Sequence, residues 1–263
     1  TSHQVWNTRA ANPTISPDYL FLRKLWHTFL WVKKDKNLLV AVLATAFFSM
    51  LAGFMQINLI DYGMDCLGLD EKESSFMFFY SAIGIATGAY FAGRLSKRNI
   101  EFALIPAGSF LILISLLFLG FISTPKFIVV VCVFVFLAGL GAGLFIVPLD
   151  TFIQIAMPTK TRGEGLALNS FLSWVGIALA GVFMFIFDKI SLPPNGGFLF
   201  FVIPAGILFI FSQHYLKDFF FRFCVSLIVR LAYKVRTIGI ENVPLQGPAV
   251  LIVNHASYMD SLL

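Results

Sequence analysis

The sequence predicts an all-α membrane protein whose helices cross a bilayer six times. Apolar residues make up 58% of the 263-residue chain and charged residues only 13%, against about 25% charged residues in soluble domains. A soluble domain of this length could not bury so much apolar surface, and disorder requires the opposite composition. The apolar residues also form six continuous runs, which favours helices over the shorter, alternating strands of a membrane barrel.

Each run has the roughly 17–25 residues that a helix needs to cross a bilayer. The expected spans are Leu38–Ile60, Ser75–Ala92, Phe102–Ile122, Phe127–Leu149, Leu166–Phe187 and Phe198–Tyr215. Residues 1–36 are polar, and within them Leu20–His27 has the pattern of a short amphipathic helix at the membrane surface.

The connecting segments alternate in charge. Acidic residues dominate the first loop, whereas Lys and Arg dominate the N-terminal segment, the second and fourth loops and the segment after the sixth span. The positive-inside rule therefore places both ends of the chain in the cytoplasm, with 16 of the 19 Lys and Arg residues on the inner side. An even number of spans independently places both ends on one side.

Polar side chains within or near the ends of spans are candidates for contact with a transported molecule, because placing them there costs free energy. Gln56, Asn58 and Asp61 lie at the outer end of the first span. Asp150 lies at the inner end of the fourth span, and Asn169 lies near the start of the fifth. The alternative interpretation is that each of these residues only marks the membrane interface.

Small residues recur at four-residue spacing in three spans, where they allow helix backbones to approach closely. They are Gly84, Gly88 and Ala92, then Gly139 and Gly143, then Gly176 and Ala180. Sliding helices and static packing both explain this spacing.

The three cysteines lie far apart without a metal-ligand spacing, so neither a disulfide nor a metal site is expected. No bound cofactor is expected either.

The second cytoplasmic loop carries a recognisable motif. It reads Gly93-Arg94-Leu95-Ser96-Lys97-Arg98-Asn99, and it resembles the Gly-x-Leu-x-(Asp/Asn)-Arg-x-Gly signature of major facilitator superfamily transporters. Gly93, Leu95 and Arg98 match, whereas Lys97 stands where the family has an acidic or amide residue and no second glycine follows. The resemblance implies a gating loop that includes Gly93, Arg94, Lys97 and Arg98, without the family's usual charge relay at Lys97.

A second motif lies near the C-terminus. The apolar run 249–253 is typical of a buried strand and is followed by Asn254-His255-Ala256-Ser257-Tyr258-Met259-Asp260. A histidine there can accept a proton from an attacking hydroxyl while an aspartate orients the imidazole. The segment closely resembles the first conserved block of PlsC-type glycerolipid acyltransferases, which are α/β domains. That resemblance implies that His255 is the general base and that Asp260 positions it.

The order of these segments predicts three parts: residues 1–36 as a cytoplasmic central loop, residues 37–218 as a six-helix transporter half, and residues 219–263 as the start of an acyltransferase domain. This order is similar to that of bacterial fusion proteins which join a lysophospholipid transporter to a 2-acylglycerophosphoethanolamine acyltransferase. The resemblance implies an inner-membrane protein that flips lysophospholipid inward. It also implies re-acylation on the cytoplasmic side from acyl-acyl-carrier protein or acyl-coenzyme A.

The partners implied by the resemblance are membrane lipids, the lysophospholipid, acyl-carrier protein and an N-terminal transporter half; no nucleic-acid partner is expected. Six further helices are expected before Thr1 and the remaining acyltransferase blocks after Leu263, so the 263 residues alone are expected to lack acyltransferase activity.

Two alternative functions stay open. One is a secondary transporter of another small solute, and the other is a membrane acyltransferase whose helices only anchor it.

Overall fold

The structure is a computed structural model that describes residues 21–96 and 100–232. This part of the chain contains seven α-helices and two short helical turns, without a strand. The elements are α1 (Phe21–Val32), α2 (Lys36–Asp61), the π-helical turn η1 (Tyr62–Cys66), α3 (Glu71–Ser96), α4 (Leu104–Phe121), the 3₁₀ turn η2 (Pro125–Phe127), α5 (Ile128–Ala156), α6 (Arg162–Lys189) and α7 (Pro194–Ala232). The predicted strand at 249–253 lies outside the described residues.

Six of these helices, α2 to α7, are long and apolar enough to cross a membrane. Each predicted span lies largely within one of them, so the all-α membrane fold is confirmed. Most of the helices extend beyond the predicted apolar runs, because backbone hydrogen bonding continues into the polar flanks. At the start of α2, for example, the Asp35 carboxylate accepts hydrogen bonds from the backbone N–H groups of Asn37 and Leu38 at 3.0 and 3.2 Å.

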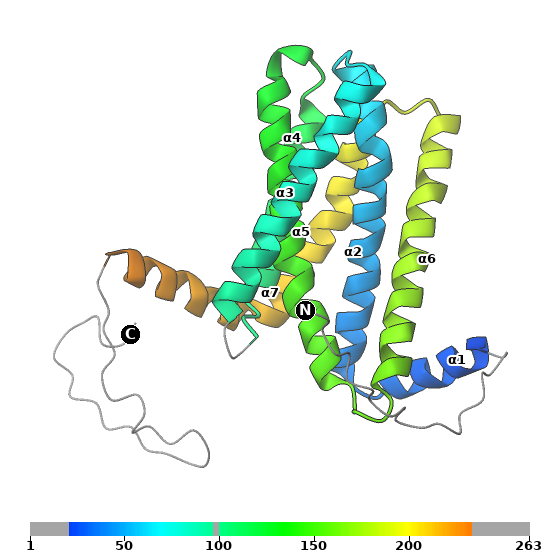
Figure 1. The fold of residues 1–263 in the computed structure, drawn as a ribbon, viewed down its shortest axis with the longest axis vertical. Coiled ribbons are helices and arrows are strands. Elements are labelled where there is room, and N and C mark those ends of the chain that lie inside the picture. Colours follow the sequence, from blue (N-terminus) through cyan, green and yellow to red (C-terminus); the bar gives the residue numbers. More distant parts are fainter. Residues whose placement is uncertain (1–20, 97–99, 233–263) are drawn as a thin grey trace, which may run out of the picture.

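The largest difference from the predicted spans is in α7. The sixth span was expected to end at Tyr215, but α7 continues through the expected domain boundary at 218–219 to Ala232. In Figure 1 the last part of α7 runs outward from the bundle. Pro204 lies within this long helix, and the apolar-basic mixture after residue 218 still permits helix formation.

Helix α1 confirms the predicted amphipathic segment and is longer than expected. It packs against α6 at one end of the bundle, where it buries Thr28 and Val32. Its other face exposes Phe21, Leu22 and Trp26, the last with 60% of its surface accessible. An aromatic face of this kind is suited to the interfacial region of a membrane.

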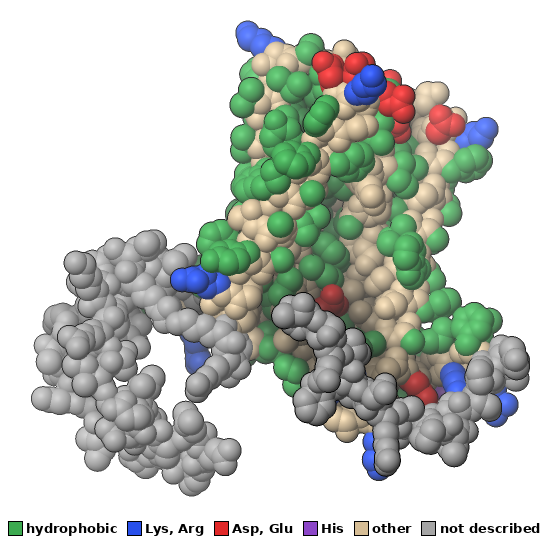
Figure 2. Space-filling view, in the orientation of Figure 1, with side chains coloured by type: hydrophobic (Ala, Val, Ile, Leu, Met, Phe, Trp, Pro, Cys, Tyr) green, Lys and Arg blue, Asp and Glu red, His purple; other side chains and the backbone are tan. Residues whose placement is uncertain are grey.

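The spans are arranged as interlocking pairs. α2 packs mainly on α6, α3 packs on α5, and α4 packs on both α5 and α7. Successive spans run in opposite directions, so the loops gather at two ends (Figure 1). We call one the acidic end, with Asp61, Asp65, Asp70, Glu71 and Glu73, and the other the basic end, with Lys33, Lys34, Lys36, Arg94, Lys160 and Arg162. Figure 2 shows most of the acidic side chains together at the upper end and Lys and Arg side chains along the lower end.

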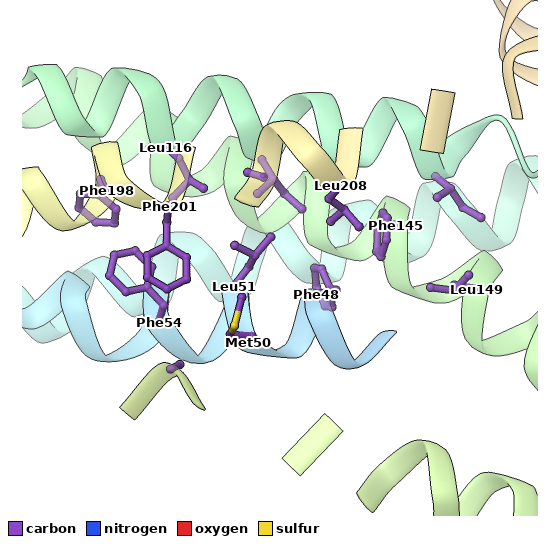
Figure 3. Close-up of a cluster of buried hydrophobic side chains, with 14 of the residues drawn as sticks. Phe48, Met50, Leu51, Phe54, Leu116, Phe145, Leu149, Phe198, Phe201 and Leu208 are labelled. Carbon is purple, nitrogen blue, oxygen red and sulfur yellow. The ribbon is translucent and has the colours of Figure 1, made fainter. Parts of the chain in front are cut away.

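The core lies between α2, α5 and α7 and is rich in phenylalanine. Phe54 of α2 stacks on Phe201 of α7 with ring centroids 3.8 Å apart. Phe198 of α7 packs edge-on against the Phe54 ring, with centroids 5.7 Å apart. Toward the basic end, Phe48 stacks on Phe145 at 5.1 Å. Figure 3 shows these rings in two groups along the bundle, with leucine side chains between the groups. Aromatic packing of this kind fixes α7 against α2.

Candidate functional site

The predicted polar residues at the end of α2 have different surroundings. Asn58 is only 1% exposed, and its Nδ2 donates to the backbone oxygen of Pro194 at 2.9 Å. This hydrogen bond joins the end of α2 to the start of α7. Asp61 is half-buried at the last position of α2. The structure therefore gives Asn58 a packing partner on another helix.

Gln56 is exposed and lines a pocket of about 400 Å³ between α2, α3 and α5, which we call the mid-span pocket. Its other lining residues are Ala52, Met55, Leu59, Phe78, Ser81, Ala82, Ile85, Ala138, Gly139 and Ala142. Gln56 and Ser81 are the polar side chains of this lining. The pocket is therefore almost wholly apolar.

The small-residue faces predicted from the sequence are sites of close helix packing. A Cβ atom at Gly84 or Gly88 of α3 would overlap the backbone of α5, and one at Gly139 or Gly143 of α5 would overlap the backbone of α3. Gly176 of α6 lies equally close to the backbone of α2. Close backbone approaches thus occur along the α3–α5 and α2–α6 contacts, where glycine allows the helices to meet.

Asp150 and Asn169 are brought together by the structure. Asp150 lies in the last two turns of α5 and Asn169 in the third turn of α6, and the Asn169 side-chain amide lies near the Asp150 carboxylate. Asn169 is 9% exposed, and its Oδ1 atom has no hydrogen-bond partner in the part of the chain that the structure describes. Among the predicted transport residues, these two come from different helices and lie near each other.

A second pocket lies at the basic end, between α2, α4, α5 and α7. We call it the basic-end pocket; its volume is about 340 Å³. It is lined by Asn37, Val40, Ala41, Ala44, Phe102, Ile105, Phe145, Leu149, Phe152, Leu208, Phe211, Ser212, Tyr215, Leu216 and Phe219. The Nζ atom of Lys36 lies 5.7 Å from the centroid of the Tyr215 ring, which places a cation beside this lining.

Sequence reasoning missed the basic-end pocket. Lys36 and Tyr215 stand at the ends of the first and sixth spans, where a basic and an aromatic residue are ordinary interface markers. Only the fold brings these two ends of the chain together. The pocket could not be found from either position alone.

The predicted gating loop is only partly described. Gly93 and Arg94 form part of the last turn of α3, both are exposed, and a Cβ atom at Gly93 would meet no other atom within 4 Å. Lys97 and Arg98 lie outside the described residues. The predicted catalytic residues His255 and Asp260 also lie outside them. Within residues 21–96 and 100–232, no group of three or more His, Cys, Asp or Glu residues is arranged to hold a metal ion.

Comparison with known proteins gives one match. The family model of the Major Facilitator Superfamily matches residues 3–181, which is more than half of the chain. No curated protein and no solved structure shows a significant match. The six membrane-spanning helices agree with this family, whose members are secondary transporters. The chain therefore belongs to the major facilitator superfamily.

Proposed function

We propose that this chain is the C-terminal half of a transporter that moves lysophospholipid to the cytoplasmic leaflet of a bacterial inner membrane. We further propose that residues 219–263 begin an acyltransferase domain that re-acylates the lipid from an acyl-carrier-protein or coenzyme A thioester. The observation that carries the proposal is the basic-end pocket, which combines an apolar interior with a cation at its edge.

A lysophospholipid has one acyl chain and a phosphate head group, so it needs an apolar site next to a positive charge. Ala41, Ala44 and Leu208 provide apolar walls, and the volume of about 340 Å³ lies within the roughly 300–1,000 Å³ of small-molecule sites. Lys36 is placed to attract a phosphate at the level of the lipid head groups. A site for a sugar or another polar solute would need more hydrogen-bonding groups than this lining offers.

The position of the pocket also supports a link to acyl transfer. Phe219 lines the pocket and is the first residue of the expected acyltransferase segment. The same helix, α7, continues from Phe219 through the first part of that segment to Ala232 and runs outward from the bundle (Figure 1). A lipid leaving the pocket on the cytoplasmic side would therefore enter the compartment in which the proposed acyltransferase segment and its acyl donors are expected.

The test uses the full-length protein in proteoliposomes supplied with labelled lysophosphatidylethanolamine. We expect saturable uptake by the wild type and, for Lys36→Gln, a rise in the concentration that gives half-maximal uptake. Lys126→Gln is the matched control, because Lys126 lies in η2 at the opposite end of the bundle. Absence of lysolipid uptake, with transport of another small solute, would instead support the alternative of an unrelated secondary transporter.

The acyl-transfer step is tested separately with His255→Ala. We expect this variant to retain uptake and to lose conversion of the lysolipid to a two-chain phospholipid when an acyl thioester is supplied. Equal conversion by the variant and the wild type would refute the role of His255. Uptake without any conversion by the wild type would refute the coupling while leaving the transport proposal intact.

A further inference from the structure

Helix α1 presents an exposed apolar flank beside the face that packs on α6. The flank carries Leu22, Trp26 and Leu30, which are 59%, 60% and 42% exposed. A spacing of four residues places these side chains on one side of a helix. The Trp26 ring also stacks on Phe29, with centroids 5.7 Å apart. Neighbouring apolar side chains with such large exposed fractions indicate an interaction surface.

The third face of α1 is basic. It carries Arg23, Lys24 and His27 and is interrupted by Trp31. Three further lysines follow the helix, so residues 21–36 hold five Lys and Arg residues against one acidic residue. Figure 2 shows hydrophobic side chains on the upper side of α1 and Lys and Arg side chains toward its lower side. A helix with this distribution lies in the interface of a bilayer, where its bases attract anionic head groups.

An apolar pocket lies between α1 and α6, and we call it the α1–α6 pocket. Its volume is about 470 Å³. The apolar walls include Phe21, Leu25, Ala167 and Phe171, and the charged residues of the lining are Lys24 and Glu164. The charges of these two residues balance each other. The preference for an anionic ligand therefore comes from the surrounding bases, whereas the pocket itself suits a hydrocarbon chain.

The depth of the α1–α6 pocket matches the place where a lipid head group joins its chains. α6 has 28 residues, so it is about 42 Å long against a hydrocarbon core of roughly 30 Å. When its middle lies at the centre of the bilayer, about four residues at each end stand in the head-group region. Glu164 then lies at the level of the head groups, and Ala167 and Phe171 lie at the level of the acyl chains.

We propose that α1 and the first turns of α6 bind an anionic phospholipid of the cytoplasmic leaflet. One acyl chain occupies the α1–α6 pocket, and the head group lies among the bases of residues 21–36. This lipid is a component of the bilayer and not the transported molecule, because the α1–α6 pocket shares no lining residue with the basic-end pocket. The inference therefore holds whatever solute the protein transports.

The test is native mass spectrometry of the full-length protein. The protein is released from detergent that contains equal amounts of phosphatidylglycerol, which is anionic, and phosphatidylcholine with the same acyl chains. We expect the wild type to retain phosphatidylglycerol preferentially. Arg23→Gln should reduce that preference roughly fivefold, the effect of one base close to an anionic membrane surface. Lys126→Gln is the matched control, because it removes one base at the opposite end of the bundle.

A second pair of variants tests the pocket. Ala167 lines the α1–α6 pocket, so Ala167→Phe should fill it and lower the retained phosphatidylglycerol several-fold. Ala178→Phe adds the same ring at an exposed position of α6 outside the pocket and should leave retention unchanged. Arg23→Gln changes only an exposed side chain, so it decides the question even where Ala167→Phe does not fold.

The expected N-terminal transporter half is the competing occupant of the apolar flank, and Trp26→Glu distinguishes it from a lipid. We expect this variant to retain less phosphatidylglycerol and to melt at the wild-type temperature in lipid-free detergent. A lower melting temperature with unchanged lipid retention would show that protein covers the flank, which contradicts the inference. Equal retention of the two lipids by the wild type, or an unchanged preference in Arg23→Gln, would also overturn it. Absence of lysolipid uptake would refute the proposed function and leave this site standing.

Discussion

The side-chain nitrogen of Asn58 lies 2.9 Å from the backbone oxygen of Pro194, and this hydrogen bond joins the end of α2 to the start of α7. Gly197, in the first turn of α7, faces the same amide, and a Cβ atom there would lie 3.2 Å from the Asn58 Oδ1 atom. The contact fixes the acidic end of the bundle. It also explains why an amide is fully buried in an otherwise apolar span.

Replacing Asn58 with leucine should lower the stability of the protein by about 1 kcal/mol, the usual scale of a hydrogen bond between membrane helices. The Pro194 oxygen would lose its side-chain donor. Thermal unfolding in detergent measures the effect. Gln56→Leu is the control, since Gln56 lies on the same helix but is exposed. Equal melting temperatures for the two variants would contradict a structural role for Asn58.

Adding a methyl group at Gly84 should separate α3 from α5. The Cβ atom would overlap the backbone oxygen of Phe136, and overpacking of this kind costs about 1–3 kcal/mol. Gly181→Ala is the matched control, because a Cβ atom at Gly181 meets nothing within 4 Å. We expect Gly84→Ala to melt at a lower temperature than the wild type and Gly181→Ala to melt at the same temperature or higher. The reverse order would be incompatible with the close α3–α5 contact.

The hydroxyl of Tyr62 donates to the backbone oxygen of Ile122 at 2.6 Å, and its ring packs edge-on against Phe198. Tyr62→Phe keeps the ring and removes the donor, so stability should fall by about 1 kcal/mol. Tyr80→Phe removes an exposed hydroxyl and should have little effect. The stabilities of the two variants are compared by unfolding under identical conditions. A Tyr62→Phe protein as stable as the wild type would contradict the predicted contribution of this hydrogen bond.

Filling the basic-end pocket should impair lysolipid transport. Ala44 lines the pocket, so Ala44→Phe would occupy space assigned to the acyl chain. We expect lysolipid uptake to fall several-fold, with the protein still folded by thermal melting. Ala178→Phe adds the same ring at an exposed position of α6 and should not change uptake. Undiminished uptake by Ala44→Phe would remove this pocket from the transport path.

The sequence was sufficient to predict the spans and the glycine faces, because both depend on local pattern. A continuous apolar run must form a helix in a bilayer, and glycines four residues apart must share one helix face. The end of α7 was not predictable in the same way. Beyond Tyr215 the residues mix apolar and basic side chains, and such a pattern does not indicate where a helix ends.

The individual residues of the candidate site were predictable from the sequence, but their arrangement relative to one another was not. Composition and position indicated Asp150 and Asn169 as costly polar residues, but their proximity depends on how α5 lies beside α6. The hydrogen bond from Asn58 to Pro194 and the approach of Lys36 to Tyr215 likewise join distant parts of the chain. Only the packing of the helices determines such pairs.

The most direct test of the central claim follows labelled lysophosphatidylethanolamine into vesicles that contain the full-length protein, with label in the outer leaflet removed by albumin. Glycerophosphoethanolamine, which has the same head group and no acyl chain, is the comparison substrate. We predict saturable, protein-dependent uptake of the lysolipid and none of its chain-free counterpart. Lysolipid uptake no greater than that of empty vesicles, or equal uptake of both compounds, would contradict a lysophospholipid transporter.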